Sequence, residues 1–327
     1  MNNTFGHSLK VTIFGASHAE EVGVVLDGVP EGIRLTADMF TADIERRRPA
    51  LHGETTRHEE DIPTIEGLDN EGLTSNRPIC ITFRNKNIRS TDYSHLRHHP
   101  RPSHADLVQY RKYGNGYNLA GGGIASGRMT VALVAAGVVA KQILRNTHFN
   151  THLIEVGGCA DPAKFESIIA EAAHDGDSVG GIIECRVSGI TPLLGEPFFD
   201  STESVISHLL FSIPAVKGVE FGDGFEGTRR RGSERNDTII DAEGHTATNN
   251  EGGINGGITN GNDIVVRVAI KPTPSIALAQ HTYNLEHKDI MPLIIGGRHD
   301  ACIARRAAVV VEAAMAIALA DLHLRAE

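Results

Sequence analysis

Cysteine is scarce in this sequence and forms no pairs along the chain. Cys80, Cys159, Cys185 and Cys302 are scattered, and no CxxC motif is present. This spacing argues against both a disulfide framework and a zinc ribbon. Residues 1–10 lack a basic segment followed by an apolar core, so a signal peptide is not expected. We therefore expect a protein of the reducing cytoplasm.

Long apolar runs and an excess of positive charge are also missing. The two most apolar stretches, residues 129–144 and 307–320, are shorter than the roughly 18 to 20 residues that a membrane span requires. We expect both to be helices that are buried on all sides. The formal net charge of -10 disfavours general binding to nucleic acid or to an anionic membrane, because both depend on clustered Lys and Arg.

The cations that are present lie in three clusters. These are Arg46 to Arg48, residues 97–101 and Arg229 to Arg231. An acidic chain that concentrates its cations in a few places is expected to bind small anionic ligands there. The other interpretation of any single run is an ordinary solvated face.

Short apolar runs predict strands, and helical spacing predicts helices. The two kinds of element do not alternate as a clean βαβ repeat, which favours an α+β fold over a doubly wound parallel sheet. We expect one domain, 1–327, with similar halves of about 1–150 and 151–327, because a glycine-rich segment precedes an apolar helix in each half. Residues 84–123 are expected to be a long functional loop or a poorly ordered segment. Strands are expected at 9–14, 22–26, 79–83, 182–187 and 264–270, and the other helices at 36–48 and 201–210.

Glycine-rich segments mark candidate phosphate sites. Gly121 to Gly123 and Gly296-Gly297 stand before the two apolar helices, where free backbone N–H groups suit a phosphate. An ordinary tight turn is the alternative. Gly222 to Gly227 matches GxGxxG, but residues 229–234 that follow are polar, and a dinucleotide site needs an apolar helix there. That motif is therefore rejected.

Histidine is plentiful, and acid–base chemistry is the role that it favours. Ser17-His18 and Ser103-His104 pair the two residue types, but adjacent side chains of an extended chain point apart and GxSxG is absent, which disfavours nucleophilic hydrolysis. Imidazole titrates near neutrality, so proton transfer is the better interpretation. A weaker hypothesis is a metal-dependent hydrolase, although the spacing matches no standard zinc arrangement. Its candidate ligands are His95, His98, His99, His104 and Asp106.

Seven short segments that combine glycine or proline with polar residues are distributed over nearly the whole chain. They are, in order, Gly15-Ala16-Ser17-His18, Arg101-Pro102-Ser103-His104-Ala105-Asp106, Lys112-Tyr113-Gly114, Gly121-Gly122-Gly123, Ala215-Val216-Lys217-Gly218-Val219-Glu220, Lys271-Pro272-Thr273-Pro274-Ser275 and Gly297-Arg298-His299-Asp300. Together, and in this order, they resemble the chorismate synthase family. One such segment could arise by chance, whereas seven in the order of the family are a specific signal.

The resemblance implies a fold and a reaction. The fold is a β-α-β sandwich with a helical layer between antiparallel sheets, assembled as a homotetramer. The reaction is the last step of the shikimate pathway, in which a lyase converts 5-enolpyruvylshikimate 3-phosphate to chorismate and phosphate by 1,4-elimination. It requires reduced FMN without net redox change. We expect the reduced FMN to come from a separate flavin reductase that uses NADPH, or from another source.

The resemblance also implies roles for residues. His18 would protonate the departing phosphate, His104 would lie by the reduced flavin, and Asp300, coupled to Ser17, would assist proton removal. Residues implied to hold FMN are Ser126, Ala215, Gly256, Lys271, Pro272, Thr273, Pro274, Ser275 and Arg298, and those implied to bind substrate anions are Arg47, Arg101 and Arg128.

Several positions depart from the family pattern. Gly53 and Ile124 stand where the family has arginine, and Pro214 stands where it has asparagine. A charge-assisted hydrogen bond contributes about 1.5 to 3 kcal/mol, so the loss of two arginines is expected to weaken anion binding unless Arg97 or Arg111 compensates. The alternative hypothesis is a divergent relative that binds FMN or a phosphorylated ligand without performing the elimination.

Overall fold

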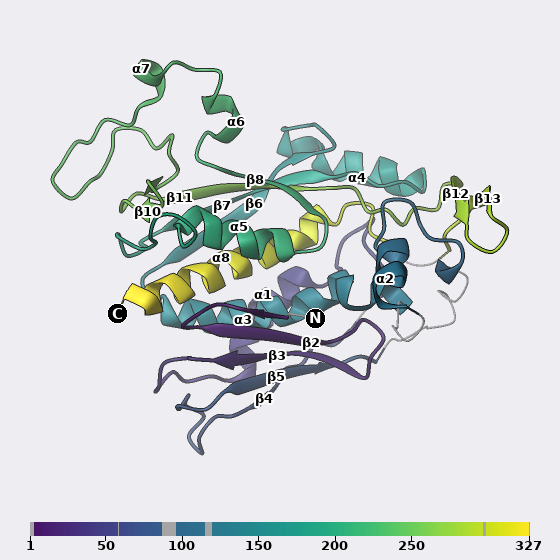
Figure 1. Cartoon of the computed structure of the whole chain (residues 1–327), viewed down its shortest axis with the longest axis horizontal. Helices are drawn as coiled ribbons and strands as arrows, with labels where there is room; N and C mark the ends of the chain where they lie inside the picture. Colours follow the sequence, from purple (N-terminus) through teal and green to yellow (C-terminus); the bar gives the residue numbers. More distant parts are fainter. Residues whose placement is uncertain (1–2, 58, 87–95, 115–119, 297–298, 327) are drawn as a thin grey trace.

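The structure of the chain is a computed structural model (Figure 1). It describes residues 3–57, 59–86, 96–114, 120–296 and 299–326. Their elements form three layers, in which helices lie between two antiparallel sheets. This arrangement agrees with the α+β sandwich that the sequence predicts.

The first sheet is built from the N-terminal part of the chain. Its inward-facing residues are β-branched or large and apolar, and Val22, Val24 and Ile81 are fully buried. Such side chains favour strands because they pack well on a pleated surface. The strand order is β1-β2-β3-β5-β4, with β1 at Thr4–Phe5, β2 at Lys10–Gly15, β3 at Glu21–Asp27, β5 at Ile79–Arg84 and β4 at Thr64–Glu66.

The second sheet is built from the C-terminal half of the chain. All of its pairings are antiparallel, and β11 pairs with β7 over its whole length. The strand order is β6-β7-β11-β8, with β6 at His148–Val156, β7 at Gly181–Ser188, β11 at Ile264–Ile270 and β8 at Val216–Phe221.

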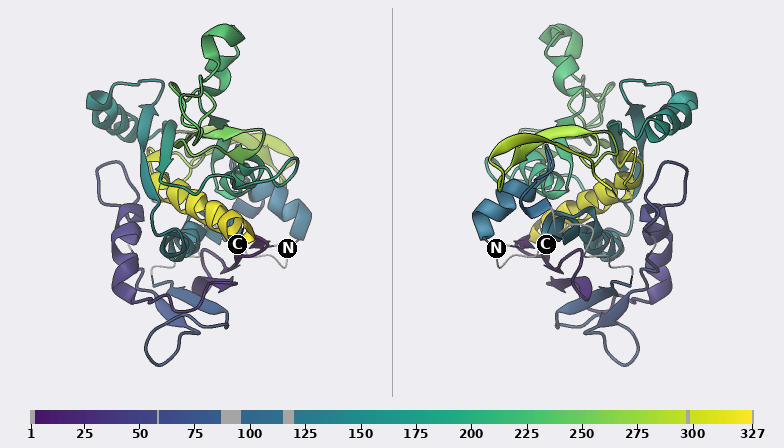
Figure 2. Two further views of the ribbon diagram at one scale, coloured as in Figure 1. Left: turned by 90° about the vertical axis from the view of Figure 1, so that its left-hand side faces the viewer. Right: turned by 90° about the vertical axis from the view of Figure 1, so that its right-hand side faces the viewer.

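Two apolar helices form the centre of the middle layer (Figure 2). They are α3, Thr130–Ile143, and α8, Ala304–Ala326. They approach closely because Gly137 has no side chain, and a Cβ there would lie 2.4 Å from the Cβ of Ala313. The shorter helices α1, Thr41–Arg47, and α5, Thr202–Ser212, pack against α8.

The helix α8 is longer than the apolar run from which it was predicted. At 23 residues it is long and apolar enough to cross a membrane by length and composition, but 83% of its most apolar window is buried inside the fold. Such extensive burial is typical of a helix in the core of a folded protein. The prediction of 307–320 is too short because Arg305 and Arg306 interrupt the apolar pattern, although both lie within the helix.

Several elements of the structure differ from those that the sequence patterns predict. The expected loop 84–123 contains the helix α2, Asp106–Tyr113, while its residues 87–95 and 115–119 lie outside the described part. The expected helix at 36–48 begins with a 3₁₀ turn, Ala37–Phe40, and Thr36 makes no side-chain capping bond. Elements that were not expected include the strands β4, β6 and β8, the helix α4, Phe165–His174, and the hairpin of β12, Gln280–Asn284, with β13, Asp289–Leu293.

Residues 222–262 form an excursion that projects from the layers (Figures 1 and 2). The GxGxxG segment, residues 222–227, contains α6, Gly224–Gly227, and α7, Gly232–Arg235, follows it. Both are single turns, so no long apolar helix follows the motif, in agreement with its rejection. The excursion also contains the short strands β9, Ile254–Asn255, and β10, Ile258–Thr259.

The N-terminal loop is anchored to α8 by one buried carboxylate. Asp321 is fully buried, and its Oδ1 accepts hydrogen bonds from the backbone N–H groups of His7, Ser8 and Leu9 at 2.8 to 2.9 Å. Asp321→Ala would leave three N–H groups without this acceptor, and we expect a loss of about 3 kcal/mol in the free energy of unfolding. Urea denaturation measures it.

Asp200→Ala is the control for this variant. Asp200 is an exposed carboxylate that contacts Arg325, as Asp321 does, but it accepts no bond from the N-terminal loop in the described structure. Its loss is expected to cost less than about 0.5 kcal/mol. Equal destabilisation by the two variants would contradict the assignment.

Candidate active site

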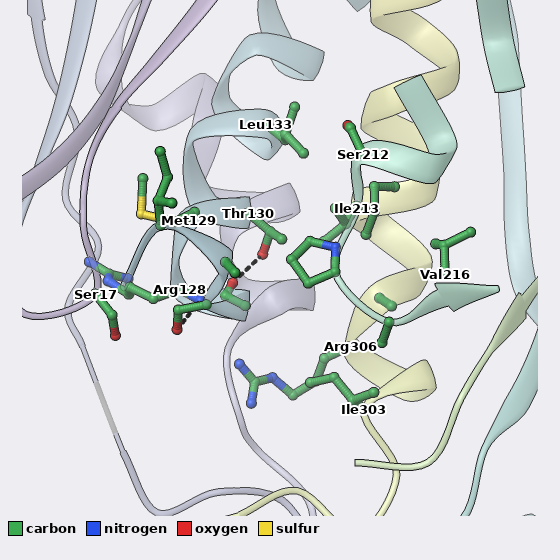
Figure 3. Close-up of a pocket in the computed structure, with 18 of the residues that line it drawn as sticks. Ser17, Arg128, Met129, Thr130, Leu133, Ser212, Ile213, Val216, Ile303 and Arg306 are labelled. Atoms are coloured by element: carbon green, nitrogen blue, oxygen red, sulfur yellow. Dashed lines mark hydrogen bonds between the residues drawn. The ribbon is translucent and has the colours of Figure 1, made fainter. Parts of the chain in front are cut away.

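A cavity of about 830 Å³ opens at one end of the helical layer. The start of α3, the end of α5 and the start of α8 converge on it (Figure 3). Part of its wall is apolar and includes Leu133, Ile213 and Val310. The rest is strongly charged, with eight Lys and Arg residues against three acidic residues among the described residues of the lining. The cations are Arg47, Arg48, Arg57, Arg101, Arg128, Lys217, Lys271 and Arg306, and the acids are Glu59, Asp61 and Asp300.

The glycine run 121–123 packs against Ser17-His18. Gly121 has φ +62, and a Cβ there would lie 2.8 Å from both Ser17 Oγ and His18 Nε2. The run thus lets two backbone segments approach closely. It does not form a helix N-terminus, because α3 begins only at Thr130, after 3₁₀ turns at 120–125 and 127–129. The expectation that the run opens directly into the helix is wrong.

His104 is held by a buried carboxylate. Its Nδ1 lies 2.8 Å from Asp106 Oδ1, and Arg101 binds the same carboxylate through Nε and Nη2 at 2.7 and 2.8 Å. Burial acts to raise the pKa of Asp106, but the hydrogen bonds from Arg101 and His104 outweigh it and hold this pKa well below its usual range. The neighbouring Ser103 has φ +57, a strained conformation of the kind that concentrates at functional sites.

Arg47 and Arg128 share the buried carboxylate of Asp61. Arg47 Nη2 donates to Asp61 Oδ2 at 2.9 Å, and Arg128 Nη1 donates to Asp61 Oδ1. Burial, together with the charges of Arg128 and Arg306, lowers the pKa of Arg47 to about 10, so it stays charged at neutral pH. Arg47 Nε and Arg128 Nη2 are buried and have no partner among the described residues. Buried donors without partners at a cavity wall indicate a site for an anion.

Arg57 was missed by the sequence analysis. Its Nη1 donates to Ser17 Oγ at 3.1 Å, its Nη2 donates to the carbonyl of Ser17 at 3.2 Å, and Glu59 pairs with it at 3.0 Å. Neither Arg97 nor Arg111, the expected substitutes for the missing arginines, is among the described residues that line the cavity. No local pattern could reveal Arg57, because Ser17 lies 40 residues away in the sequence.

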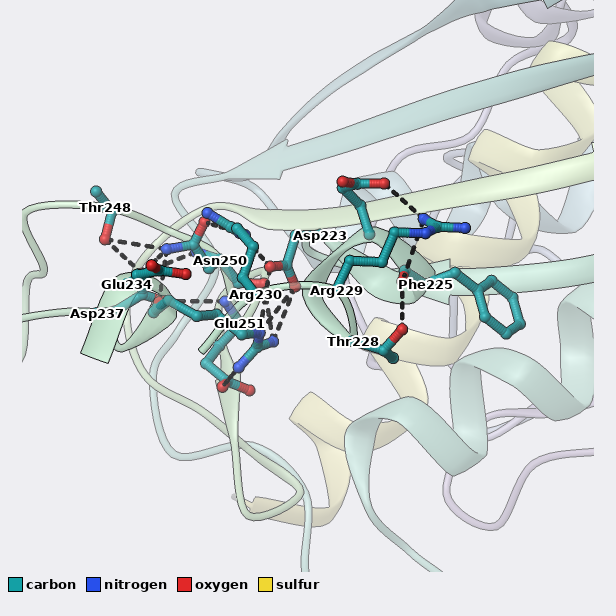
Figure 4. A network of polar contacts seen from close by, with 12 residues as sticks. Asp223, Phe225, Thr228, Arg229, Arg230, Glu234, Asp237, Thr248, Asn250 and Glu251 are labelled. Carbon is teal, nitrogen blue, oxygen red and sulfur yellow. Dashed lines mark hydrogen bonds and ion pairs between the residues drawn. The ribbon is translucent and has the colours of Figure 1, made fainter. Parts of the chain in front are cut away.

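The third arginine cluster lies away from the cavity. In the excursion, Arg229 pairs with Glu226, Arg230 pairs with Asp223, and the backbone N–H of Arg231 donates to Glu234 (Figure 4). Acidic neighbours thus pair with two of its side chains, and the expectation of a small anionic ligand at this cluster stays a prediction.

Asp300 lines the cavity beside Arg306. Arg306 Nη1 donates to both of its carboxylate oxygens at 2.8 and 3.0 Å, and the Thr55 N–H donates to Oδ1 at 3.1 Å. The two residues Ser17 and Asp300, both described, form no hydrogen bond with each other, so their expected coupling is not direct. The helix α8 begins at Ala304, four residues further on, so Asp300 is not its N-cap either.

Most of the residues expected to hold FMN lie together. Lys271 N–H donates to the carbonyl of Ala215 at 3.0 Å, Lys271 Nζ donates to the carbonyl of Ser103 at 2.6 Å, and Arg101 Nη1 donates to Ser275 Oγ at 2.9 Å. Burial, with a contribution from Lys217, lowers the pKa of Lys271. The expected FMN residues that line the cavity are Ser126, Ala215, Lys271, Thr273, Pro274 and Ser275.

The other expected FMN residues do not join this group. Pro272 is not among the lining residues. Gly256 lies between β9 and β10 in the excursion, away from the cavity wall, so a single copy of the chain does not bring it to the site. Arg298 and Gly297 lie outside the described residues. His18 contacts the lining through Gly121.

The metal hypothesis finds no geometric support in the part of the chain that the structure describes. No group of three or more His, Cys, Asp or Glu residues is placed there to hold a metal ion. Asp106 is paired with both His104 and Arg101. His95 lies outside the described residues.

Comparison with known proteins agrees with the motif order. Residues 9–324 match the family described as chorismate synthase. The chain is 52% identical to a chorismate synthase of Chitinophaga pinensis over 98% of this chain and 96% of that protein, and 41% identical to one of Dehalococcoides mccartyi over 100% and 98%. A crystal structure of a chorismate synthase superposes with a TM-score of 0.76 at 28% identity, covering 98% of this chain and 93% of that chain. The chain belongs to the chorismate synthase family.

Proposed function

We propose that the cavity is where this lyase converts 5-enolpyruvylshikimate 3-phosphate to chorismate and phosphate, with reduced FMN bound beside the substrate. The observation that carries the proposal is the pair of buried, unpartnered guanidinium donors, Arg47 Nε and Arg128 Nη2, in the wall that also contains His104. A substrate with one phosphate and two carboxylates needs such donors, and the surplus of cations offsets its charge.

The described residues fit a flavin. The apolar wall, which includes Leu133, Ile213 and Val310, suits a flat aromatic ring system. Thr273 Oγ1 is buried without a partner among the described residues, on the loop that the family uses for FMN. The bound reduced flavin would supply an electron transiently to the elimination and recover it.

The histidines and Asp300 would handle protons. We assign His18 as the acid that protonates the departing phosphate, and His104 as the group beside the flavin. The ionised Asp106 lies 2.8 Å from Nδ1 of His104, and Nε2 of the same ring lies on the side of Gly122 in the cavity lined by His104. Asp300, oriented by Arg306 and the Thr55 N–H, would assist removal of the substrate proton.

Anaerobic turnover tests the function directly. Purified protein is incubated with 5-enolpyruvylshikimate 3-phosphate and chemically reduced FMN, and chorismate and phosphate are expected to form in equal amounts. Flavin binding without turnover would overturn the proposal. It would favour a divergent relative that only binds FMN or a phosphorylated ligand, an alternative that the comparisons do not support.

Arg57 is expected to supply positive charge that this chain lacks at positions 53 and 124. Because one charge-assisted hydrogen bond contributes about 1.5 to 3 kcal/mol, Arg57→Gln should raise the KM for the substrate about tenfold or more. Steady-state kinetics under saturating reduced FMN measure this change. Arg111→Gln is the control, because Arg111 is exposed on α2 and does not line the cavity. Similar KM values for both variants would remove Arg57 from the substrate site.

The supply of flavin and the assembly belong to the same proposal. We infer that a separate reductase using NADPH, or another source, provides reduced FMN, that the enzyme works in the cytoplasm, and that it assembles as a homotetramer. The position of Gly256 in the projecting excursion supports an assembly in which another copy brings this residue to the site. Light scattering of the purified chain would reveal the assembly, and a monomeric mass at working concentration would contradict it.

A further inference from the structure

The buried Asp61 lies between two guanidinium groups of the cavity wall. Each of its carboxylate oxygens accepts a hydrogen bond from one of them, Oδ2 from Arg47 and Oδ1 from Arg128. Its side chain is 1% exposed, and the side chains of Arg47 and Arg128 are 6% and 4% exposed. Burial acts to raise the pKa of Asp61, but the two arginines outweigh it and lower this pKa, so the carboxylate is ionised at neutral pH.

The backbone at Asp61 is strained. Its φ of +48 lies in the left-handed region, which is unfavourable for residues other than glycine. Such strain persists where the surroundings enforce it, and it concentrates at ligand sites. Aspartate and asparagine tolerate this region better than other side chains do. Asp61→Asn therefore removes the charge while it keeps both the size of the side chain and its compatibility with the backbone.

A second hydrogen bond connects Arg128, through Asn85, to the segment that contains Ser17 and His18. Its Nε donates to Asn85 Oδ1 at 2.8 Å, and Asn85 Nδ2 donates to the carbonyls of Ala16 and Ala19 at 3.3 and 2.8 Å. These two carbonyls flank Ser17-His18. The hydrogen bonds thus run from Asp61 through Arg128 to the backbone around His18.

We propose that Asp61 is a positioning residue that sets the spacing and orientation of the Arg47 and Arg128 guanidinium groups for the anionic groups of the substrate. This inference rests on the proposed function, in which both arginines bind the substrate. Without the carboxylate the two like charges repel each other, and two long side chains regain rotamer freedom. The two buried donors that have no partner among the described residues, Arg47 Nε and Arg128 Nη2, then lose their fixed geometry.

The chain contains a matched arrangement outside the cavity. In the excursion, Asp223 accepts hydrogen bonds from Arg230 through Oδ2 and from Arg235 through both carboxylate oxygens (Figure 4). None of these three residues is among the described lining of the cavity. Asp223→Asn therefore removes the same kind of carboxylate from between two arginines without changing a residue of the described cavity lining.

The test compares Asp61→Asn with Asp223→Asn in the full chain. Calorimetric titration measures the Kd for 5-enolpyruvylshikimate 3-phosphate, and anaerobic kinetics measure KM and kcat. For Asp61→Asn we expect Kd and KM to rise roughly tenfold or more, while kcat changes less. Asp61→Glu, which restores the charge, should recover part of the loss. Asp223→Asn should bind as the unaltered chain does.

The outcomes separate this inference from the proposed function. If the unaltered chain binds the substrate but does not turn it over, the proposed function fails, while the Kd values still test Asp61. A folded Asp61→Asn variant with Kd within twofold of the unaltered chain overturns the positioning role, as does a loss of thermal stability alone. If that variant does not fold, Asn85→Ala replaces it, because it removes the other anchor of Arg128, and an unchanged Kd there overturns the role as well.

Discussion

Replacing His104 by alanine is expected to lower kcat by roughly 10² to 10⁴-fold, the usual contribution of a positioned acid–base group. The ring lines the cavity and is fixed by Asp106, whose charge is itself maintained by Arg101. A Cβ at Gly122 would lie within 3.7 Å of its Nε2, so the ring sits against the glycine run. Single-turnover kinetics with reduced FMN under anaerobic conditions measure the effect on chemistry, and thermal denaturation reports whether the fold is kept.

The excursion supplies a matched control for His104. His245 Nδ1 lies 2.7 Å from Asp241 Oδ2, which reproduces the histidine–carboxylate pair, but its side chain is 55% exposed and does not line the cavity. His245→Ala should therefore leave kcat unchanged. The kcat of Asp106→Asn is expected to lie between those of His104→Ala and His245→Ala, because the His104 ring would keep a polar neighbour but lose the charged carboxylate. A kcat within fivefold of the unaltered chain in His104→Ala would show that the role is misassigned.

The sequence predicts the elements that carry a strong apolar pattern. The expected strand 264–270 coincides with β11, Ile264–Ile270, because five of its seven residues are β-branched Ile or Val and all five are buried. The helix α2 was not predicted because it is polar and its surface lacks an apolar stripe. The first turn of α8 was not predicted because Arg306, a charged residue at the cavity wall, interrupts an otherwise apolar pattern.

Some residues of the site can likewise be predicted from local sequence, and others cannot. Motif residues such as His104 and Arg128 could be identified because they stand in short segments that resemble a family. Arg57 and Asp61 could not, because their function depends on partners that are distant in the sequence. Asp61 meets Arg128 across 67 positions, and Arg57 meets Ser17 across 40. The fold determines which charges pair over such separations, so no local spacing in the sequence predicts them.

Arg128→Gln is expected to have the largest effect on substrate affinity. Removal of one partner from a buried, hydrogen-bonded charge pair costs about 2 to 5 kcal/mol, which corresponds to roughly 30-fold or more in KM or Kd. Part of this cost arises because Asp61 keeps only Arg47, and part because the ligand loses the Nη2 donor. Arg128→Lys keeps the charge but not the planar fork, so its Kd should lie between those of the glutamine variant and the unaltered chain.

The two contributions can be separated with a second pair of variants. Arg230→Gln breaks the equivalent contact to Asp223 in the excursion, so it should leave Kd unchanged. The double variant Arg128→Gln with Asp61→Asn removes the unpaired carboxylate, and it should regain stability in urea denaturation without regaining affinity. Recovery of affinity in the double variant would mean that Arg128 serves only to neutralise Asp61. Binding weaker than that of Asp61→Asn alone, together with restored stability, would identify Arg128 as a direct ligand of the substrate anion, because only the lost donor separates the double variant from Asp61→Asn.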